Sequence, residues 1–199
     1  MPLVWDTRID QAQVEDRVKR LGLAKTAIYV LGCLTHARDA VVTFHSDSLP
    51  AFHPKFQSMV RELDQFWSEY PQCLDANSID DTVQAMFDLL PDEEQRTNEF
   101  LLAEDVWMDG VSFAFGLFQT DDSEKIALDA LNAIDRAYVF VYTFHHELDG
   151  MNESESEIRA VESTSKFCID EIEFQIALLG VVESLKGLPP PYKELIGLL

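Results

Sequence analysis

The sequence predicts an all-α fold, in which residues 1–199 form a single-domain bundle of about seven helices. Three observations lead to this prediction. Apolar residues recur three or four positions apart along nearly the whole chain, which is the spacing of one face of an α-helix. No segment shows the strict apolar and polar alternation between hairpin turns that marks strands. The length of 199 residues and the hydrophobic content of 47% provide enough apolar surface for a packed core.

The first two helices are predicted over residues 8–21 and 23–45. An apolar stripe along the first helix consists of Ile9, Val14, Val18 and Leu21. Gly22 suits the end of this helix, because glycine adopts the backbone conformation of a C-terminal cap without steric cost. The second helix contains the run "AIYVLGCL" and is therefore expected to be buried more deeply.

Two breaks, "SDSLPAFHP" and "YPQCLDANS", delimit the next predicted helices, which cover residues 55–69 and 78–90. Pro54 suits the first turn of the earlier helix, because its missing N–H would have no partner there in any case. Ser78, followed three residues later by Asp81, resembles a capping box at the start of the later helix.

A fifth helix is predicted to open with Pro91 and "DEEQ", whose acids favour a helix N-terminus, and to run to Phe118. Gly110 is a candidate kink within it. Four large apolar residues stand too close together in the sequence to share one face of this helix: Phe113, Phe115, Leu117 and Phe118. The helix is therefore either central and buried on all sides, or partly exposed for a partner.

The last two long helices are predicted from Ser123 or Asp122 to His146 and over residues 153–186, and the tail "KELIGLL" can add a final turn. The intervening stretch "TFHHELDGMNESESE" places His145 and His146 at one helix end, and its acids at the next helix start. Adjacent histidines on a helix point about 100° apart, so they do not readily share a metal ion. The chain also lacks the Glu-x-x-His pattern of di-metal bundles. We therefore interpret this stretch as a helix–loop–helix connection and expect no metal and no cofactor.

The net charge is the strongest functional signal in the sequence. The chain has 15 basic and 36 acidic residues, which give a net charge of −21. Residues 1–61 have a net charge of +2 and residues 62–199 one of −23, and residues 62–109 hold 14 acids against the single base Arg96. Such a surface repels nucleic acid and anionic membranes and attracts a basic protein. An acidity that serves only solubility remains an open alternative at this stage.

Cysteine usage and hydropathy predict a cytoplasmic protein. Cys33, Cys73 and Cys168 are odd in number and widely spaced, without a Cys-x-x-Cys pair, which is typical of a reducing compartment. The apolar runs "AIYVLGCL" and "AYVFVYTF" are much shorter than the about 20 residues of a membrane-spanning helix. The opening residues do not follow the pattern of a signal peptide.

Few residues suggest catalysis, and we assign no catalytic residue from the sequence. Asp109, Asp135 and Asp170 stand in apolar helical contexts, where a buried carboxyl group could act as a general acid or base. The more ordinary interpretation is an acid on a helix surface, or one that pairs with Arg136 or Lys166. The chain has neither a nucleophile-elbow pattern nor a glycine-rich phosphate loop.

The segment "RDAVVTFH" places Arg38 six residues before His45, with Asp39 directly after the arginine. It resembles the Arg-x4–6-His motif of the all-α HEPN ribonucleases and their toxin relatives. That resemblance implies an arginine and a histidine that activate the RNA 2′-hydroxyl and stabilise the phosphate across a dimer interface. The acidic charge of the chain opposes an RNA substrate, although this segment lies in the one third that is not acidic.

In size, charge and lack of a catalytic motif, the chain is similar to the acidic immunity proteins that bacteria make against toxins, including nuclease and peptidoglycan-directed effectors. This general resemblance implies a cytosolic protein, not an enzyme, that binds and inhibits a basic toxin or effector. Nuclease toxins are basic where they bind phosphate, so a carboxylate-rich face can steer onto that cleft and cover it. No site residue carries over from the resemblance.

We expect partner binding at two groups of acids: Asp80, Asp81, Asp92, Glu93 and Glu94, or Glu153, Glu155 and Glu157. Exposed aromatic side chains nearby would serve as anchors. Two alternatives remain: a HEPN-like ribonuclease that uses Arg38 and His45, and a non-catalytic helical regulatory domain. The oligomeric state is left open.

Overall fold

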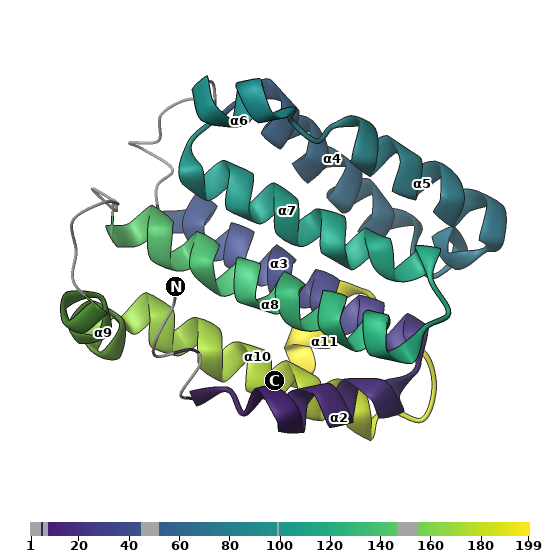
Figure 1. The fold of residues 1–199 in the computed structure, drawn as a ribbon. Coiled ribbons are helices and arrows are strands. Elements are labelled where there is room, and N and C mark those ends of the chain that lie inside the picture. The colour runs from purple at the N-terminus through teal and green to yellow at the C-terminus, as the bar shows by residue number, and fades with distance from the viewer. Residues whose placement is uncertain (1–4, 6–7, 45–51, 99, 147–154) are drawn as a thin grey trace.

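The computed structural model of the chain describes residues 5, 8–44, 52–98, 100–146 and 155–199 (Figure 1). These residues form ten α-helices, eight of them with seven or more residues, and no β-strand. The all-α class is therefore confirmed, with more helices than the predicted seven. The helices are α2 (Gln11–Leu21), α3 (Leu23–Phe44), α4 (Pro54–Glu69), α5 (Ala76–Asp88), α6 (Glu93–Asn98), α7 (Leu102–Gly116), α8 (Ser123–His146), α9 (Glu155–Thr164), α10 (Lys166–Ser184) and α11 (Tyr192–Leu195).

Three helices, α3, α7 and α8, form the centre of the bundle. In Figure 1, α4 and α5 lie on one side of them, and α2 and α10 lie on the other. Residues Ala27–Leu34 of α3 are buried on all sides, as the run "AIYVLGCL" predicted. In α7, Trp107 and Phe115 are completely buried and Phe113 is partly buried against the core, as is Phe118 in the 3-10 turn Leu117–Gln119 that follows. The fifth predicted helix is therefore central in its second half. Within the described residues, no helix is long and apolar enough to span a bilayer.

Gly110 allows α7 to pack closely against its neighbours and does not kink the helix. The helix runs unbroken from Leu102 to Gly116. A Cβ atom at Gly110 would lie 2.7 Å from Cδ2 of Leu34 and 2.9 Å from Cβ of Arg136. Both distances are far inside van der Waals contact, so a side chain at this position would push the central helices apart.

The predicted helix from Pro91 to Phe118 is divided in two by a buried carboxylate. Asp92 caps α6 by accepting a hydrogen bond from the N–H of Gln95 at 2.9 Å. After α6, Glu104 restarts the helix as α7: its Oε2 accepts from the N–H of Leu101 at 2.9 Å. Its Oε1 accepts from the N–H of His53 at 2.6 Å, so the same side chain fixes the entry to α4. Only 1% of Glu104 is exposed.

The predicted last long helix is also divided, at Ser165. This residue caps α10, because its Oγ accepts from the N–H of Cys168 at 3.4 Å. The Oγ atom also lies 2.9 Å from Nε2 of His146, at the end of α8. At α5 the expected cap was Ser78, but Asp75 takes that place and accepts from both the N–H and the hydroxyl of Ser78. Because Asp75 is the N-terminal cap, α5 begins directly after it at Ala76, before Ser78.

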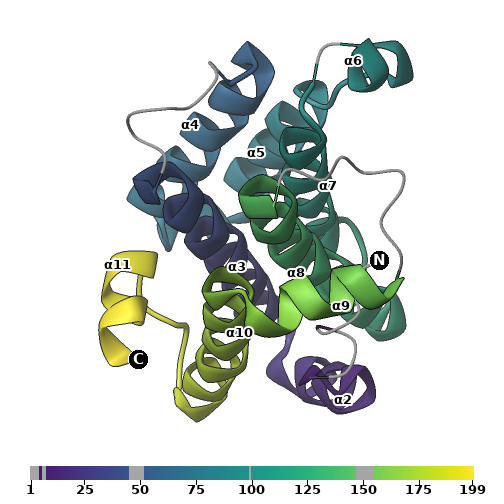
Figure 2. The same ribbon diagram turned by 90° about the vertical axis from the view of Figure 1, so that its left-hand side faces the viewer.

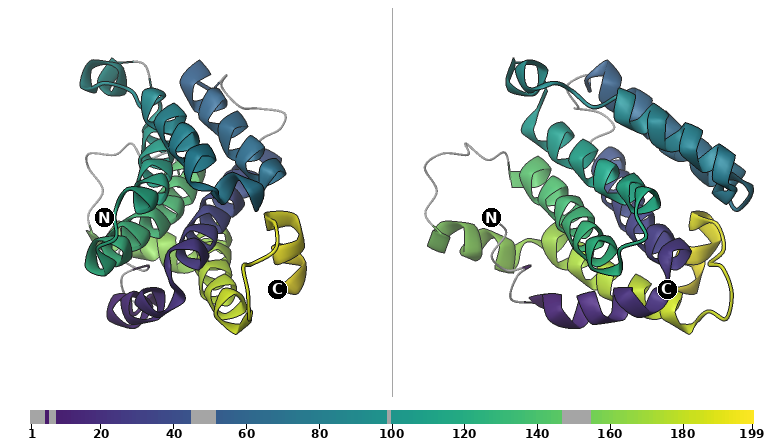
Figure 3. Two further views of the ribbon diagram at one scale, coloured as in Figure 1. Left: turned by 90° about the vertical axis from the view of Figure 1, so that its right-hand side faces the viewer. Right: turned by 45° about the vertical axis from the view of Figure 1, so that its right-hand side comes forward.

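The C-terminal segment folds back against α4. The hydroxyl of Tyr70, at the end of α4, donates to the carbonyl oxygen of Pro189 at 2.6 Å. Tyr192, in α11, packs against Trp67 of α4 with 5.7 Å between ring centroids. The short helix α11, which the sequence predicted as an added turn, therefore stands beside α3 and α4 at one edge of the bundle (Figures 2 and 3).

Candidate binding groove

An open groove of about 660 Å³ lies between α3, α4 and α11. This volume is in the range of about 300–1,000 Å³ that is usual for ligand sites. Its walls combine charged side chains with aromatic ones. The residues that line it are Thr35, Arg38 and Asp39 from α3, Asp64, Trp67 and Ser68 from α4, and Pro191, Tyr192, Lys193, Glu194 and Ile196 from the C-terminal segment.

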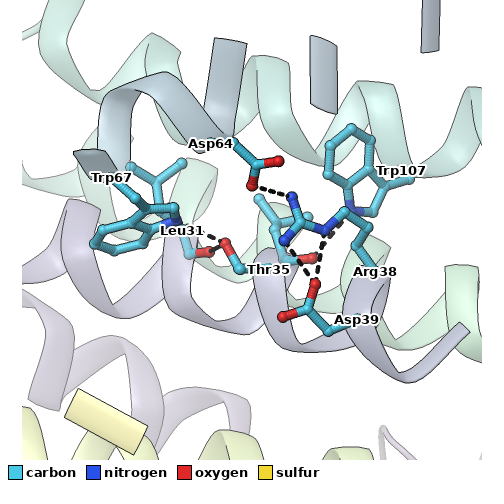
Figure 4. A network of polar contacts seen from close by, with 8 residues as sticks. Leu31, Thr35, Arg38, Asp39, Asp64, Trp67 and Trp107 are labelled. Atoms are coloured by element: carbon cyan, nitrogen blue, oxygen red, sulfur yellow. Dashed lines mark hydrogen bonds and ion pairs between the residues drawn. The ribbon is translucent and has the colours of Figure 1, made fainter. Parts of the chain in front are cut away.

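At the base of the groove, the guanidinium group of Arg38 links two carboxylates (Figure 4). Its Nε and Nη2 donate to Oδ1 of Asp39 at 2.9 and 2.6 Å, and its Nη1 donates to Oδ1 of Asp64 at 2.6 Å. The side chain of Arg38 is 10% exposed. Burial acts to lower the pKa of this guanidinium, and the two carboxylates raise it by more, so Arg38 keeps its charge.

The two carboxylates line the groove and keep unused hydrogen-bonding capacity. Arg38 uses only the Oδ1 atom of each, and among the described residues no donor binds Oδ2 of Asp39 or of Asp64. Their side chains are 47% and 58% exposed. Two carboxylates and one guanidinium leave one negative charge at the base of the groove. At the rim, Lys193 and Glu194 offset each other, so the groove as a whole is anionic.

The aromatic wall of the groove is held in a fixed orientation. Nε1 of Trp67 donates to the hydroxyl oxygen of Thr35 at 2.9 Å, and that hydroxyl donates to the carbonyl oxygen of Leu31 at 2.7 Å. Tyr192 packs against the indole ring from the C-terminal side. Burial, and then the nearby carboxylate of Asp39, raise the pKa of Tyr192 well above its usual value, so this phenol stays neutral at physiological pH.

The ribonuclease interpretation required Arg38 as an available cation. In the structure its guanidinium is buried and bound by Asp39 and Asp64, so it does not offer its charge to a phosphate. His45 lies outside the described residues. Among the residues that the structure describes, no group of three or more His, Cys, Asp or Glu side chains is placed to hold a metal ion.

The five predicted partner-binding acids between Asp80 and Glu94 are all exposed, on α5 and at the start of α6. Among the described residues, neither Asp80 nor Asp81 forms an ion pair or a side-chain hydrogen bond, so both carboxylates are open to a partner. Asp92 is partly engaged as the cap of α6. These acids belong to a stretch, residues 62–95, that contains ten acids and no lysine or arginine.

The second predicted group stands at the start of α9. Glu157 is exposed, Glu155 begins the helix, and Glu153 lies outside the described residues. Figures 1 and 2 show α7 and α8 between α9 and the pair α5 and α6. The two predicted groups therefore stand on helices that do not neighbour each other in the bundle.

The carboxylates singled out as candidate acid–base groups are engaged in ion pairs. As the sequence suggested, two of them pair with neighbours on the same helix, while the third pairs across to α6. The pairs are Asp135 with Arg136, Asp170 with Lys166, and Asp109 with Arg96. Each of these carboxylates has a structural partner that accounts for its position.

Two further clusters of buried polar groups are hydrogen-bonded inside the bundle, around Glu171 and around Glu162. Glu171 is 1% exposed; it accepts from Nε2 of Gln175 at 2.9 Å and lies 2.8 Å from Nδ1 of His36. Gln175 in turn accepts from Nε1 of Trp5 at 3.0 Å. In a separate cluster, the buried hydroxyl of Tyr138 donates to Oε1 of Glu162 at 3.1 Å. These contacts join helices to one another.

Sequence reasoning did not find the groove. Asp64, Trp67 and Tyr192 drew no attention as site residues, because each has an ordinary helical context. The one available signal was Asp39, which follows Arg38 directly and could have suggested a neutralised arginine. Comparisons of the chain with protein-family models, with curated proteins and with solved structures found no match in any of the three.

Proposed function

We propose that this chain is a protein-binding inhibitor, which docks onto a basic protein through its acidic surface and blocks the partner's functional site. In biological terms this is a cytoplasmic immunity protein of a bacterial toxin or effector system. A nuclease is the target class that best fits the charge. The observation that carries the proposal is the stretch of residues 62–95, which has ten acids and no lysine or arginine and whose acids are largely exposed on α4, α5 and α6.

Electrostatics supports this function in two ways. A surface region with a single sign of charge accelerates encounter with an oppositely charged partner, and the effect decreases as salt screens it. A nuclease must itself be basic where it holds phosphate, so carboxylates on a complementary surface occupy the place of the substrate's charges. Leu101 and Leu102, which are 43% and 56% exposed at the start of α7, follow the acids of α6 along the chain and offer apolar contacts to a partner.

The distribution of charge favours binding over mere solubility. Residues 1–61 have a net charge of +2, so the acid excess is concentrated in the later part of the chain. A surface that is acidic for solubility alone would need no such asymmetry. The ribonuclease alternative is less favoured, because Asp39 and Asp64 already neutralise the buried guanidinium of Arg38.

The test compares two double charge reversals that change the net charge equally. The first, Asp80→Lys with Asp81→Lys, alters the acidic stretch on α5. The control, Asp16→Lys with Glu173→Lys, alters exposed acids on α2 and α10. A partner is captured from native lysate at low salt and identified, and its association rate with each variant is measured across a salt series.

We expect the α5 variant to associate about tenfold more slowly at low salt and with a weaker salt dependence, because local charge steers the encounter. The control should change the rate much less. The activity of the captured partner, such as nucleic acid cleavage, should fall when one equivalent of the chain is added. Equal rates for the two variants, or a partner whose activity the chain leaves unchanged, would remove the basis for the proposal.

A further inference from the structure

We infer that the groove between α3, α4 and α11 receives an arginine side chain that the basic partner presents. This inference rests on the proposed function for the source of the arginine, but the chemistry of the groove stands by itself. The groove has a volume of about 660 Å³, which accommodates one long side chain and its neighbouring backbone.

The first argument is that each of the two carboxylates has an oxygen that accepts no hydrogen bond from the described residues. Arg38 holds Asp39 and Asp64 through their Oδ1 atoms, and within the described residues their Oδ2 atoms have no donor. The buried guanidinium therefore holds both carboxylates in position and neutralises only one of their two negative charges. A second cation that approaches from the groove meets a net negative charge and two preorganised acceptors.

The second argument is the aromatic wall. Trp67 is oriented by its hydrogen bond to Thr35, and Tyr192 packs against it. A planar guanidinium stacks on such rings while its N–H groups reach carboxylate oxygens in the same plane. A lysine ammonium lacks the planar fork and is more strongly hydrated, so it fits this combination less well. The groove is not suited to a metal ion, since no three-ligand cluster occurs among the described residues.

The third argument is the apolar surface beside the groove. Ile196 lines the groove and is 40% exposed, and Leu198 and Leu199 follow it with 54% and 51% exposure. Apolar side chains around a desolvated ion pair exclude water, and this arrangement is typical of the residues that dominate protein interfaces. The partner segment that carries the arginine would contact these residues.

The experiment uses the indole N–H signals in ¹⁵N NMR spectra of the full chain. The chain has three tryptophans. Trp5 is buried against Gln175 and does not line the groove, so its signal serves as the internal reference. Trp67, which lines the groove, is the reporter. The probe is the capped peptide Gly-Gly-Arg-Gly-Gly. Its citrulline analogue, which is neutral but of nearly the same shape, and its lysine analogue are the matched controls.

We expect the arginine peptide to shift the Trp67 signal with about millimolar affinity, as suits a single side chain, and to leave the Trp5 signal unmoved. The citrulline peptide should cause no shift, and the lysine peptide should bind several times more weakly. Asp64→Asn, which keeps an acceptor for Arg38, should weaken binding about fivefold, a usual loss for one exposed ion pair. Asp80→Asn, an equal change outside the groove, should have no effect.

Glu194→Lys provides a second variant, because this rim residue is exposed and does not hydrogen-bond to Arg38. It should also weaken the arginine peptide. A Trp67 signal that does not move, or that moves equally with citrulline or lysine, overturns the inference. Because the probe is a defined peptide, such a failure leaves the acidic-surface proposal standing. Conversely, binding of the arginine peptide without any inhibited partner would preserve the groove and refute the proposed function.

Discussion

Replacement of Gly110 by alanine tests whether the central helices pack as closely as the structure shows. Gly110 lies on α7, where the helix faces both α3 and α8. A Cβ atom added there would stand 2.7 Å from Cδ2 of Leu34 and 2.9 Å from Cβ of Arg136. The first atom ends a flexible side chain and can move aside. The second is attached directly to the backbone of α8, so it can give way only if that helix shifts.

The expected change in stability follows from two opposing terms. Overpacking of a dense interior costs about 1–3 kcal/mol. Alanine gains back about 1 kcal/mol over glycine through its greater helix propensity. Because the contact with Arg136 cannot be relieved by a side-chain rotation, we expect the upper part of this range, a net loss of about 1–2 kcal/mol. For a chain of this length, that corresponds to a Tm lower by about 3–6 °C.

The assay is urea unfolding followed by circular dichroism, in which the midpoint should fall while the m-value stays constant. The control is Gly180→Ala on α10, where a Cβ atom would meet nothing within 4 Å. That variant should gain about 0.5–1 kcal/mol from helix propensity alone. If Gly110→Ala were as stable as the parent chain, or stabilised like the control, the close approach of α7 to α8 would be refuted.

Three further predictions concern buried polar groups. All three cysteines, Cys33, Cys73 and Cys168, are buried and free, and burial raises the pKa of Cys73 to about 11. At pH 8 the thiolate form of Cys73 is then about 100-fold scarcer than that of an ordinary thiol. Alkylation of the cysteines should therefore be slow in the folded chain and rapid in urea. Arg38→Met should lower the free energy of unfolding by only about 1–2 kcal/mol, because the carboxylates of Asp39 and Asp64 are half exposed and stay hydrated without the guanidinium. If the parent chain cleaved RNA and this variant did not, a purely structural role of Arg38 would be contradicted. Glu171→Ala should cost about 1–3 kcal/mol in urea unfolding, because it removes a buried acceptor of the Gln175 amide and the partner of the partly exposed His36 ring. A loss below about 1 kcal/mol would show that water replaces the carboxylate.

The sequence was sufficient to predict those helix boundaries that are set by residues at the boundary itself. The helix that ends at His146 begins at Ser123, because Asp122 accepts a hydrogen bond from the N–H of Glu124 at 2.9 Å. Pro54 starts α4 for a similar local reason, since its fixed φ suits a first helical turn. The all-α class and the buried character of α3 followed from periodicity and run length in the same way.

Boundaries set by distant partners could not be read from the sequence. Glu104 restarts the helix at α7, but one of the two N–H groups it binds belongs to His53, which is 51 positions away. The groove presents the same difficulty. Trp67 and Tyr192 form one wall, yet nothing in the local pattern of either residue indicates the other. Only the pairing of Arg38 with Asp39 was visible, because the two are adjacent in the chain.

The carboxylate of Glu104 also has a consequence for the order in which parts of the bundle open. It is the shared acceptor for the backbone amides of His53 and Leu101, which precede α4 and α7. If either helix start detaches, the other loses part of its anchor, because a buried charge that keeps a single donor is poorly solvated. The amide protons of the two segments should therefore exchange with solvent as one cooperative unit, although they are far apart in the chain. The groove lies at a different edge of the bundle, where Arg38 and the C-terminal segment hold it together. The backbone amides around it can therefore stay protected from exchange while that unit opens.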